Sequence, residues 1–91
     1  MMEQKFDIDI PEHIFESIKS GNLKFISLKM ENYCFQKGDI VKLFKRTTDY
    51  NFYNGYIDKN GYRNSKDKAE QMEFHIIYVD YSIDGYVIIG I

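Results

Sequence analysis

A chain of 91 residues has room for one domain with a small core, because a domain of this size buries only about 60–65% of its unfolded surface. Hydrophobic residues make up 44% of the chain and aromatic residues 16%, a composition that argues against intrinsic disorder. Twelve basic and fourteen acidic side chains give a net charge of -2, which excludes the overall basic excess of most nucleic-acid-binding modules. Any contact with RNA would need a local basic patch.

The cysteine and histidine content limits the chemistry of the chain. A single cysteine, Cys34, excludes an intramolecular disulfide and a zinc site built from cysteines. The two histidines have no such partners, so we predict no metal site and no cofactor. The N-terminal residues contain no apolar signal core, and apolar runs such as 86–89 are too short to cross a bilayer. We therefore expect a cytoplasmic protein that makes no membrane contact, and its oligomeric state is open.

The N-terminal part of the chain predicts a strand followed by a helix. Apolar and acidic residues alternate over residues 5–10, which is the period of a half-buried strand. Pro11 suits the first turn of a helix, and Ile14 and Ile18 share one stripe on it. We therefore predict a helix over about residues 11–20 that lies on a sheet.

Alternation returns from residue 23 to residue 29, with apolar and polar residues on both faces. This pattern predicts a strand that is buried for part of its length and lines an accessible site with the rest. Residues 37–39 form a turn sequence that leads into a strand over residues 40–44. Residues 47–72 contain several turn-forming pairs and predict an irregular hairpin or long loop, with one helical turn around residues 66–72.

Two strands are predicted at the C-terminus, over residues 73–81 and 86–91, with a turn at Asp84 and Gly85 between them. Apolar residues on both faces of the first strand predict that it is central in its sheet. The element order predicts an α+β fold, a small, strongly bent sheet or partly open β-barrel of five to six mostly antiparallel strands with one main helix near the N-terminus. We expect a single domain over residues 1–91 with an irregular insertion at about 47–72.

Several segments, in this order and at this spacing, resemble the ASCH family of the PUA-like superfamily, in particular its small phage and Gram-positive type. The matching segments are Pro11 to Gly21, Lys24 to Lys29, Phe35, Gly38 to Ile40, Leu43 and Gly85 to Ile91. Residues 47–72 stay unaligned. The resemblance implies a small PUA-like domain that binds RNA or a nucleotide-like ligand in a cleft between the helix, the strand 24–29 and the turn near Gly38.

The second strand departs from the usual signature of that family, which is Lys-Thr-x-Glu-x-Arg. This chain has Lys24-Phe25-Ile26-Ser27-Leu28-Lys29, and a lysine at the arginine position offers a point charge in place of a bidentate fork. One branch of the family contains an amidohydrolase that acts on acetylcytidine, and the resemblance implies that its lysine and threonine correspond to Lys24 and Ser27. The glutamate of that enzyme has no counterpart here, and Lys24 and Ser27 point to opposite faces of a regular strand. An acetylcytidine amidohydrolase-like enzyme is therefore our third hypothesis, and we assign no catalytic residue.

The first hypothesis is binding of RNA or a nucleotide-like ligand without catalysis. Lysines and aromatic residues interleave between residues 24 and 46, and single-stranded RNA recognition requires aromatic platforms and phosphate-contacting lysines. The alternative is that the lysines only cover exposed strand faces and block edge pairing. The predicted ligand-binding residues are Lys24, Ser27, Lys29, Tyr33, Phe35, Lys37 and Lys42.

The second hypothesis is a phage or mobile-element protein-interaction module that inhibits a host protein. It would use the tyrosine-rich region 47–72 as its contact surface, and these aromatic residues could equally pack within a loop. The predicted contact residues are Tyr50, Phe52, Tyr53 and Tyr56. The partners that we predict are thus RNA or a nucleotide-like ligand, or a host protein.

Overall fold

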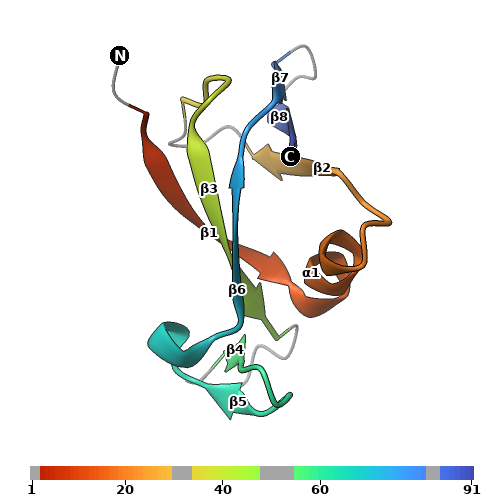
Figure 1. The fold of residues 1–91 in the computed structure, drawn as a ribbon, viewed down its shortest axis with the longest axis vertical. Helices are drawn as coiled ribbons and strands as arrows, with labels where there is room; N and C mark the ends of the chain where they lie inside the picture. The colour runs from red at the N-terminus through yellow and green to blue at the C-terminus, as the bar shows by residue number, and fades with distance from the viewer. Residues whose placement is uncertain (1–2, 30–33, 48–54, 82–84) are drawn as a thin grey trace.

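The computed structural model describes residues 3–29, 34–47, 55–81 and 85–91 (Figure 1). The larger, five-stranded sheet contains β1 (Lys5–Pro11), β3 (Ile40–Arg46), β4 (Tyr56–Ile57), β5 (Arg63–Asn64) and β6 (Gln71–His75). The smaller, three-stranded sheet contains β2 (Phe25–Lys29), β7 (Tyr78–Asp80) and β8 (Tyr86–Gly90). One α-helix, α1 (Glu12–Lys19), follows β1, and a 3-10 turn, η1 (Lys66–Lys68), precedes β6. The strongly curled half-barrel sheet, mostly antiparallel strands and one helix near the N-terminus confirm the predicted α+β class.

Strand β3 is the centre of the larger sheet. It pairs with β1 in parallel, so that Ile8 lies opposite Leu43, and with β6 in antiparallel orientation, so that Met72 lies opposite Leu43 on the other side. The β1–β3 pair is parallel, whereas the other pairs among the described strands are antiparallel. It can form because α1 and β2 lie between β1 and β3 in the sequence and supply the long connection that parallel strands need.

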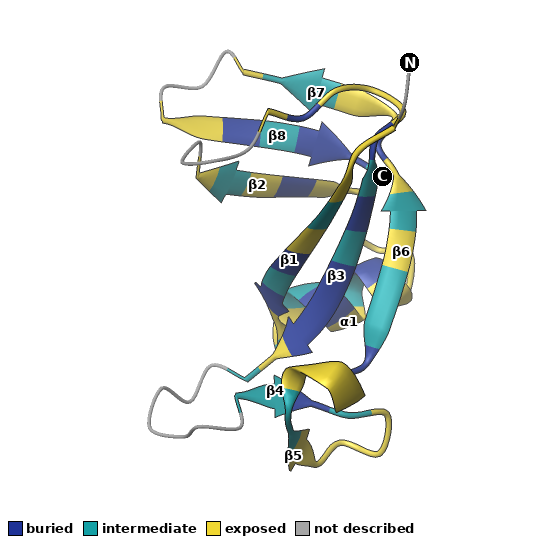
Figure 2. Cartoon of the chain, turned by 90° about the vertical axis from the view of Figure 1, so that its left-hand side faces the viewer, coloured by how far each residue is buried: buried dark blue, intermediate teal, exposed yellow. Residues whose placement is uncertain are grey.

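The core lies between the inner face of the larger sheet, helix α1 and the inner face of the smaller sheet (Figure 2). Phe15 of α1 is fully buried and Ile18 is 6% exposed. The helix begins directly after Pro11, whose φ of -58° suits a helix start, and a glycine with a φ of 84°, Gly21, follows its end. The predicted helix over 11–20 is therefore confirmed as Glu12–Lys19.

The predicted single strand over residues 73–81 is wrong. The chain forms two strands there, β6 and β7, and they belong to different sheets. Ile76 continues beside β3, because its N–H donates to the carbonyl of Asp39, whereas the N–H of Ile77 donates to the carbonyl of Gly90 in β8. The side chains that pack on the core shift at this point from even residues, such as the buried Ile76, to the odd residue Val79, which is partly buried. A strand that changes sheets therefore looks apolar on both faces in the sequence, as a central strand does.

Within the described residues, β6 pairs only with β3 and β7 only with β8, so neither strand is central. The central strand of the smaller sheet is β8, which pairs with β2 on one side and β7 on the other. The strands predicted at 5–10, 23–29, 40–44 and 86–91 are confirmed with small changes at their ends. The predicted turn at 84–85 lies partly outside the described residues, and Gly85 has the positive φ of 77° that such a turn uses.

The described part of the region 47–72 contains the predicted irregular hairpin and the predicted helical turn. Strands β4 and β5 pair over two residues each, and η1 provides one turn. This hairpin lies at the end of the molecule opposite β7 and β8 (Figure 1). In the ranges that the structure describes, no helix has the length and apolar character needed to cross a membrane.

Candidate functional site

Exposed aromatic side chains gather on the outward face of the smaller sheet. Strand pairing brings Phe25, Gly90 and Tyr78 into one row across β2, β8 and β7. The Phe25 side chain is 53% exposed and Tyr78 is 47% exposed. Their rings pack edge to face, with 5.9 Å between the centroids and 86° between the planes. Two aromatic rings therefore form a pair that solvent reaches from outside.

The absence of a side chain at Gly90 makes room for this pair. A Cβ atom at Gly90 would lie 2.9 Å from Cβ of Tyr78 and 3.2 Å from Cε1 of Phe25. Contacts this short require the neighbouring atoms to move. The glycine in the middle of β8 therefore allows the two rings to approach each other over the sheet surface.

Two further rows complete this surface, which we call the aromatic face. Side chains in one row of a sheet share a face, so the outward positions follow from the register. The aromatic face comprises Phe25, Ser27, Lys29, Tyr78, Asp80, Tyr86, Ile88 and Gly90. Tyr86 is 41% exposed and lies opposite Lys29, four residues and about 13 Å along β8 from Gly90. The face thus carries a second aromatic position beside a lysine.

The phenol of Tyr78 is held in its protonated form. Its hydroxyl donates to Oδ2 of Asp80 at 3.2 Å. This hydrogen bond and the negative charge of Asp80 raise the pKa of Tyr78 above its usual value. Tyrosine is uncharged at neutral pH in any case. What the bond adds is that the Tyr78 hydroxyl is engaged by Asp80, whose negative charge also lies on the aromatic face.

A cleft of about 310 Å³ runs along the edge of β2 that faces away from β8. Its lining is mostly apolar and comes from the end of β1, from α1 and from β2: Asp9, Ile10, Pro11, Ile14, Leu23, Phe25, Ile26, Ser27 and Leu28. The cleft corresponds to the predicted space between the helix and the strand 24–29. The turn at Gly38 does not contribute to its lining.

The backbone of β2 also presents hydrogen-bonding groups to this cleft. In an antiparallel pair, alternate residues direct their N–H and C=O groups toward the partner strand. The N–H of Ile91 donates to the carbonyl of Lys24, so Ile26 and Leu28 also point these groups at β8. Phe25 and Ser27 consequently direct their N–H and C=O groups away from β8, toward the cleft. The cleft therefore combines apolar walls with a few backbone donors and acceptors, as ligand pockets commonly do.

The predicted ligand-binding residues fall into separate places. Lys24 is exposed just before β2, while Ser27 and Lys29 are exposed on β2 itself. Lys37 is exposed in the turn before β3, and Lys42 is half-buried on β3 of the other sheet. The structure thus brings Ser27 and Lys29 together on one face of β2 but not the other predicted lysines.

The aromatic residues predicted to contact a ligand also separate. Phe35 is 2% exposed and packs edge to face on Phe6, with 4.8 Å between ring centroids, so its ring belongs to the core. Tyr33 lies outside the described residues. The aromatic platform of the smaller sheet instead includes Tyr78 and Tyr86, which were not predicted. The glycine inside the strand 86–91 was a sequence signal for a close approach at this place.

Most of the residues predicted to contact a protein lie outside the described residues, namely Tyr50, Phe52 and Tyr53. The fourth, Tyr56, is half-buried, and its hydroxyl donates to Oδ2 of Asp9 at 2.7 Å. Burial, followed by this hydrogen bond and the charge of Asp9, raises the pKa of Tyr56 to about 12. The hydroxyl of Tyr56 is therefore already engaged in holding the hairpin to β1.

A buried ion-pair cluster, also missed from the sequence, joins α1 to β3 and the segment before β6. The Lys45 ammonium donates to Glu16 and lies 3.4 Å from Oε1 of Glu70, whose Oε2 accepts from Lys19 at 2.6 Å. The side chains of Lys45 and Glu70 are only 9% and 11% exposed. Burial lowers the pKa of Lys45, but Glu16 and Glu70 together outweigh it and raise the pKa above its usual value. Lys45 therefore stays protonated and acts as a structural cation.

No protein-family model matches the sequence, and no curated protein matches it significantly. Among the described residues, no group of three or more histidine, cysteine, aspartate or glutamate side chains could hold a metal ion. The fold and the site therefore define only the structural class of this protein. The chain forms a small α+β domain with a half-barrel sheet and an exposed aromatic sheet face.

Proposed function

We propose that this chain is a small PUA-like domain of the ASCH type that binds single-stranded RNA on its aromatic face, without catalysis, in the cytoplasm. The proposal rests on one observation, the exposed pair of Phe25 and Tyr78 on the strand and sheet that also carry Ser27 and Lys29. Stacking of a base on an aromatic ring contributes about 1–3 kcal/mol and tolerates any base. An RNA strand laid across β2, β8 and β7 would find two such positions, at the Phe25 pair and at Tyr86.

The charges near β2 suit the phosphates of such a strand. Lys29 is exposed at the end of β2 and lies opposite Tyr86 on the aromatic face, and lysine contacts phosphate as a point charge. Lys24, just before β2, points to the other side of the strand. One phosphate contact on single-stranded RNA predicts a slope of about -0.7 for log affinity against log salt. Because the net charge of the chain is -2, Lys29 must supply this attraction. We therefore expect modest affinity that weakens with salt.

The cleft along β2 suits an unstacked base from the same strand. Its apolar walls, including Ile10 and Ile26, could enclose the faces of a base. The backbone groups of Phe25 and Ser27 could bond to the base edge, since unstacked bases offer their Watson–Crick edges for hydrogen bonding. Ser27, which lines both the cleft and the aromatic face, joins the two parts of the proposed site.

The test is a titration of a fluorescent single-stranded RNA at about 50 mM and about 200 mM salt. We expect binding at the lower salt and an affinity about two- to threefold weaker at the higher salt, from the slope given above. Absence of binding at low salt, or an affinity that salt does not change, would rule out the proposal. Double-stranded RNA serves as the control, since its bases are stacked and cannot reach the aromatic face.

A second candidate function is a phage or mobile-element protein-interaction module that inhibits a host protein. Its support is the side chain of Tyr62, which is 71% exposed on the β4–β5 hairpin within the region 47–72. A pull-down from host lysate treated with nuclease separates the two candidates. Retention of one protein that a Tyr62→Ala variant no longer retains supports this candidate, and loss of all partners counts against it.

The third candidate, an acetylcytidine amidohydrolase-like enzyme, rests on Lys24 and Ser27 alone. Lys24 lies just before β2 begins, and strand alternation directs its side chain away from the side of Ser27. Release of acetate from acetylcytidine that is lost in Lys24→Ala would support it. Absence of acetate release from the purified protein would remove it.

A further inference from the structure

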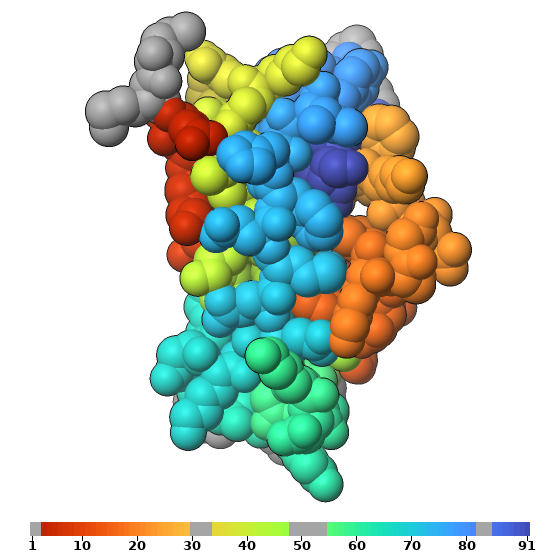
Figure 3. Space-filling model, viewed as in Figure 1, coloured from red at the N-terminus to blue at the C-terminus, as the bar shows by residue number. Residues whose placement is uncertain are grey.

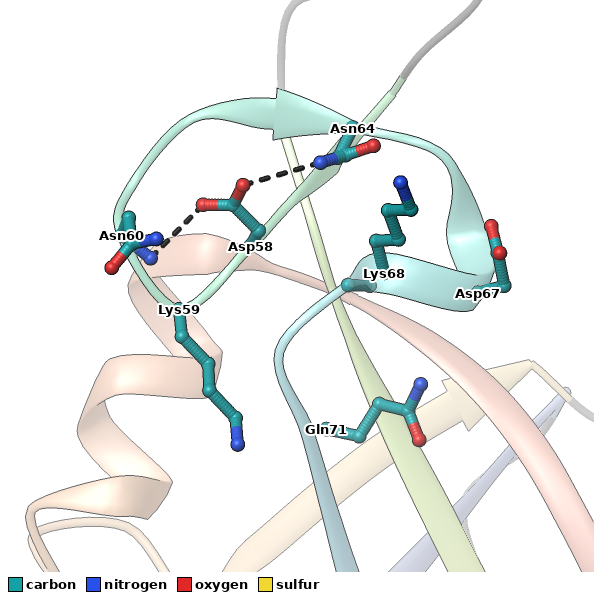
Figure 4. Close-up of a pocket in the computed structure, with 8 residues that line it drawn as sticks. Asp58, Lys59, Asn60, Asn64, Asp67, Lys68 and Gln71 are labelled. Atoms are coloured by element: carbon teal, nitrogen blue, oxygen red, sulfur yellow. Dashed lines mark hydrogen bonds between the residues drawn. The ribbon is translucent and has the colours of Figure 1, made fainter.

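A second concavity lies at the other end of the molecule from the aromatic face. A pocket of about 560 Å³ is enclosed by the β4–β5 hairpin, η1 and the start of β6 (Figure 4). Figure 3 shows these green to cyan residues forming the lower end of the molecule, away from the blue residues of β7. The lining residues are Asp58, Lys59, Asn60, Asn64, Asp67, Lys68, Ala69 and Gln71.

Both carboxylates of the pocket are already occupied by neighbouring donors. Oδ1 of Asp58 accepts the backbone N–H groups of Asn60 and Tyr62, each at 2.9 Å, and Oδ2 accepts from Nδ2 of Asn64 at 3.2 Å. Figure 4 shows this carboxylate turned into the hairpin, toward Asn60 and Asn64. Asp67 accepts a short hydrogen bond from the hydroxyl of Ser65. Asp58 is therefore committed to the hairpin through both of its oxygens, whereas the bond from Ser65 engages Oδ1 of Asp67 alone.

The groups that remain are mainly donors. Lys59 and Lys68 are exposed, and the charge of Lys68 acts on the neighbouring Asp67, whose pKa it helps to lower. The side-chain amides of Asn60 and Gln71 also border the pocket. Two ammonium groups and two amides give a concave surface that offers hydrogen bonds to oxyanions and to hydroxyl groups.

The walls that carry these donors are fixed by short-range backbone contacts. The N–H of Glu70 donates to the carbonyl of Ile57 at 2.8 Å, which ties the segment after η1 to β4. The N–H of Asp58 donates to the carbonyl of Tyr62 at 2.9 Å, which closes the hairpin. The hydrogen bond from Tyr62, above all, lowers the pKa of Asp58 below its usual value, which favours the charged form that accepts these bonds. The site is therefore preorganised, which reduces the entropy that binding costs.

We propose that this pocket binds a small phosphate ester with a hydroxyl-bearing body, such as a sugar phosphate. Lys59 and Lys68 contact the phosphate, and the amides of Asn60 and Gln71 contact the hydroxyl groups. The two lysines and the two aspartates of the lining sum to zero formal charge, so the pocket has little long-range attraction for a polyanion. This arrangement therefore favours direct contacts to a compact ligand over contacts to the backbone of a nucleic acid. The inference is independent of RNA binding on the aromatic face.

The test is a titration of the full chain in which binding is monitored by two-dimensional amide NMR. Ribose 5-phosphate, ribose and inorganic phosphate serve as separate probes. We expect saturable shifts within residues 58–71 on addition of ribose 5-phosphate, with a dissociation constant of about 1 mM or below. Lys59→Gln and Lys68→Gln should each weaken binding about tenfold, as loss of a charge-assisted hydrogen bond does. The control is Lys5→Gln, an exposed lysine of β1 whose ion pair with Glu73 lies on the surface, which should leave the affinity unchanged.

Three outcomes would overturn the proposal. Absence of saturable shifts up to about 10 mM ribose 5-phosphate would exclude a useful site. Equal affinity for ribose and ribose 5-phosphate would exclude recognition of the phosphate. Shifts within 58–71 on addition of a single-stranded RNA, with none for ribose 5-phosphate, would assign the pocket to nucleic acid. The two glutamine variants must retain the wild-type amide spectrum outside the pocket, and both lysines are exposed, so we expect them to fold.

Discussion

The ring of Phe25 meets the ring of Tyr78 across Gly90, with 5.9 Å between the two centroids. The two residues belong to the outer strands of the smaller sheet, and β8 holds them at this distance. Both rings are about half exposed, at 53% and 47%. Their pairing therefore depends on the sheet and on the glycine between them, and it leaves two ring faces available for contact.

Substitution of Gly90 by alanine should disturb this pair. The new Cβ would lie 2.9 Å from Cβ of Tyr78, so the strand or the ring must move. We expect a loss of about 1–3 kcal/mol in the free energy of unfolding, as other overpacked sites give. Urea denaturation measures the loss. Ser27→Ala, an exposed change on the same face, should cost no more than about 0.5 kcal/mol, and an equal stability of both variants would contradict the account.

Removal of the buried lysine should have a larger effect. Lys45→Ala leaves the carboxylate of Glu70, which is 11% exposed, with Lys19 as its remaining partner. We expect a loss of about 3 kcal/mol in the free energy of unfolding, because the change removes a side chain that is 9% exposed together with its charge-assisted hydrogen bonds to Glu16 and Glu70. The matched control is Lys5→Ala, since Lys5 pairs with Glu73 at 2.9 Å on the surface, where such pairs contribute less than about 1 kcal/mol. A similar loss in both variants would show that Lys45 has no special role.

The hydrogen bond between Tyr56 and Asp9 should be detectable as a raised pKa of Tyr56 in an alkaline titration. The pKa of Tyr56 is raised to about 12 in the folded protein, against 10.0 for an ordinary tyrosine. The contribution of Tyr56 to stability is therefore complete below about pH 10 and is lost as the pH rises through about 12. Phenolate absorbance should show a tyrosine that titrates near pH 12, which Tyr56→Phe removes and Tyr62→Phe leaves in place. A titration near pH 12 that is unchanged in Tyr56→Phe would refute this assignment.

The sequence predicted those parts of the fold that depend on local patterns. Alternation over 5–10 predicted β1, and Pro11 with the isoleucine stripe predicted α1. Pairing between distant strands could not be obtained in this way, because it depends on contacts far apart in the chain. The parallel pair of β1 and β3 and the change of sheet between Ile76 and Ile77 are both of this kind.

The candidate site was predicted only in part, because some of its features also depend on strand pairing. Ser27 and Lys29 lie on the aromatic face, because their strand and its alternation were predicted correctly. The exposure of Tyr78 and the burial of Phe35 depend on which strand lies beside each ring, and no local pattern carries that information. The burial of Lys45 follows from the extension of β3 to Arg46, two residues beyond the predicted end, which carries this lysine onto the inner face under α1.

The central claim, RNA binding on the aromatic face, is tested most directly by replacing each ring with an apolar side chain. Phe25→Leu and Tyr78→Leu remove the stacking surface and keep an apolar side chain, and each should weaken binding of fluorescent single-stranded RNA about tenfold at low salt. Tyr62→Leu, which changes an aromatic side chain that is 71% exposed on the distant hairpin, should leave the affinity unchanged. Wild-type affinity in both Phe25→Leu and Tyr78→Leu would contradict the account.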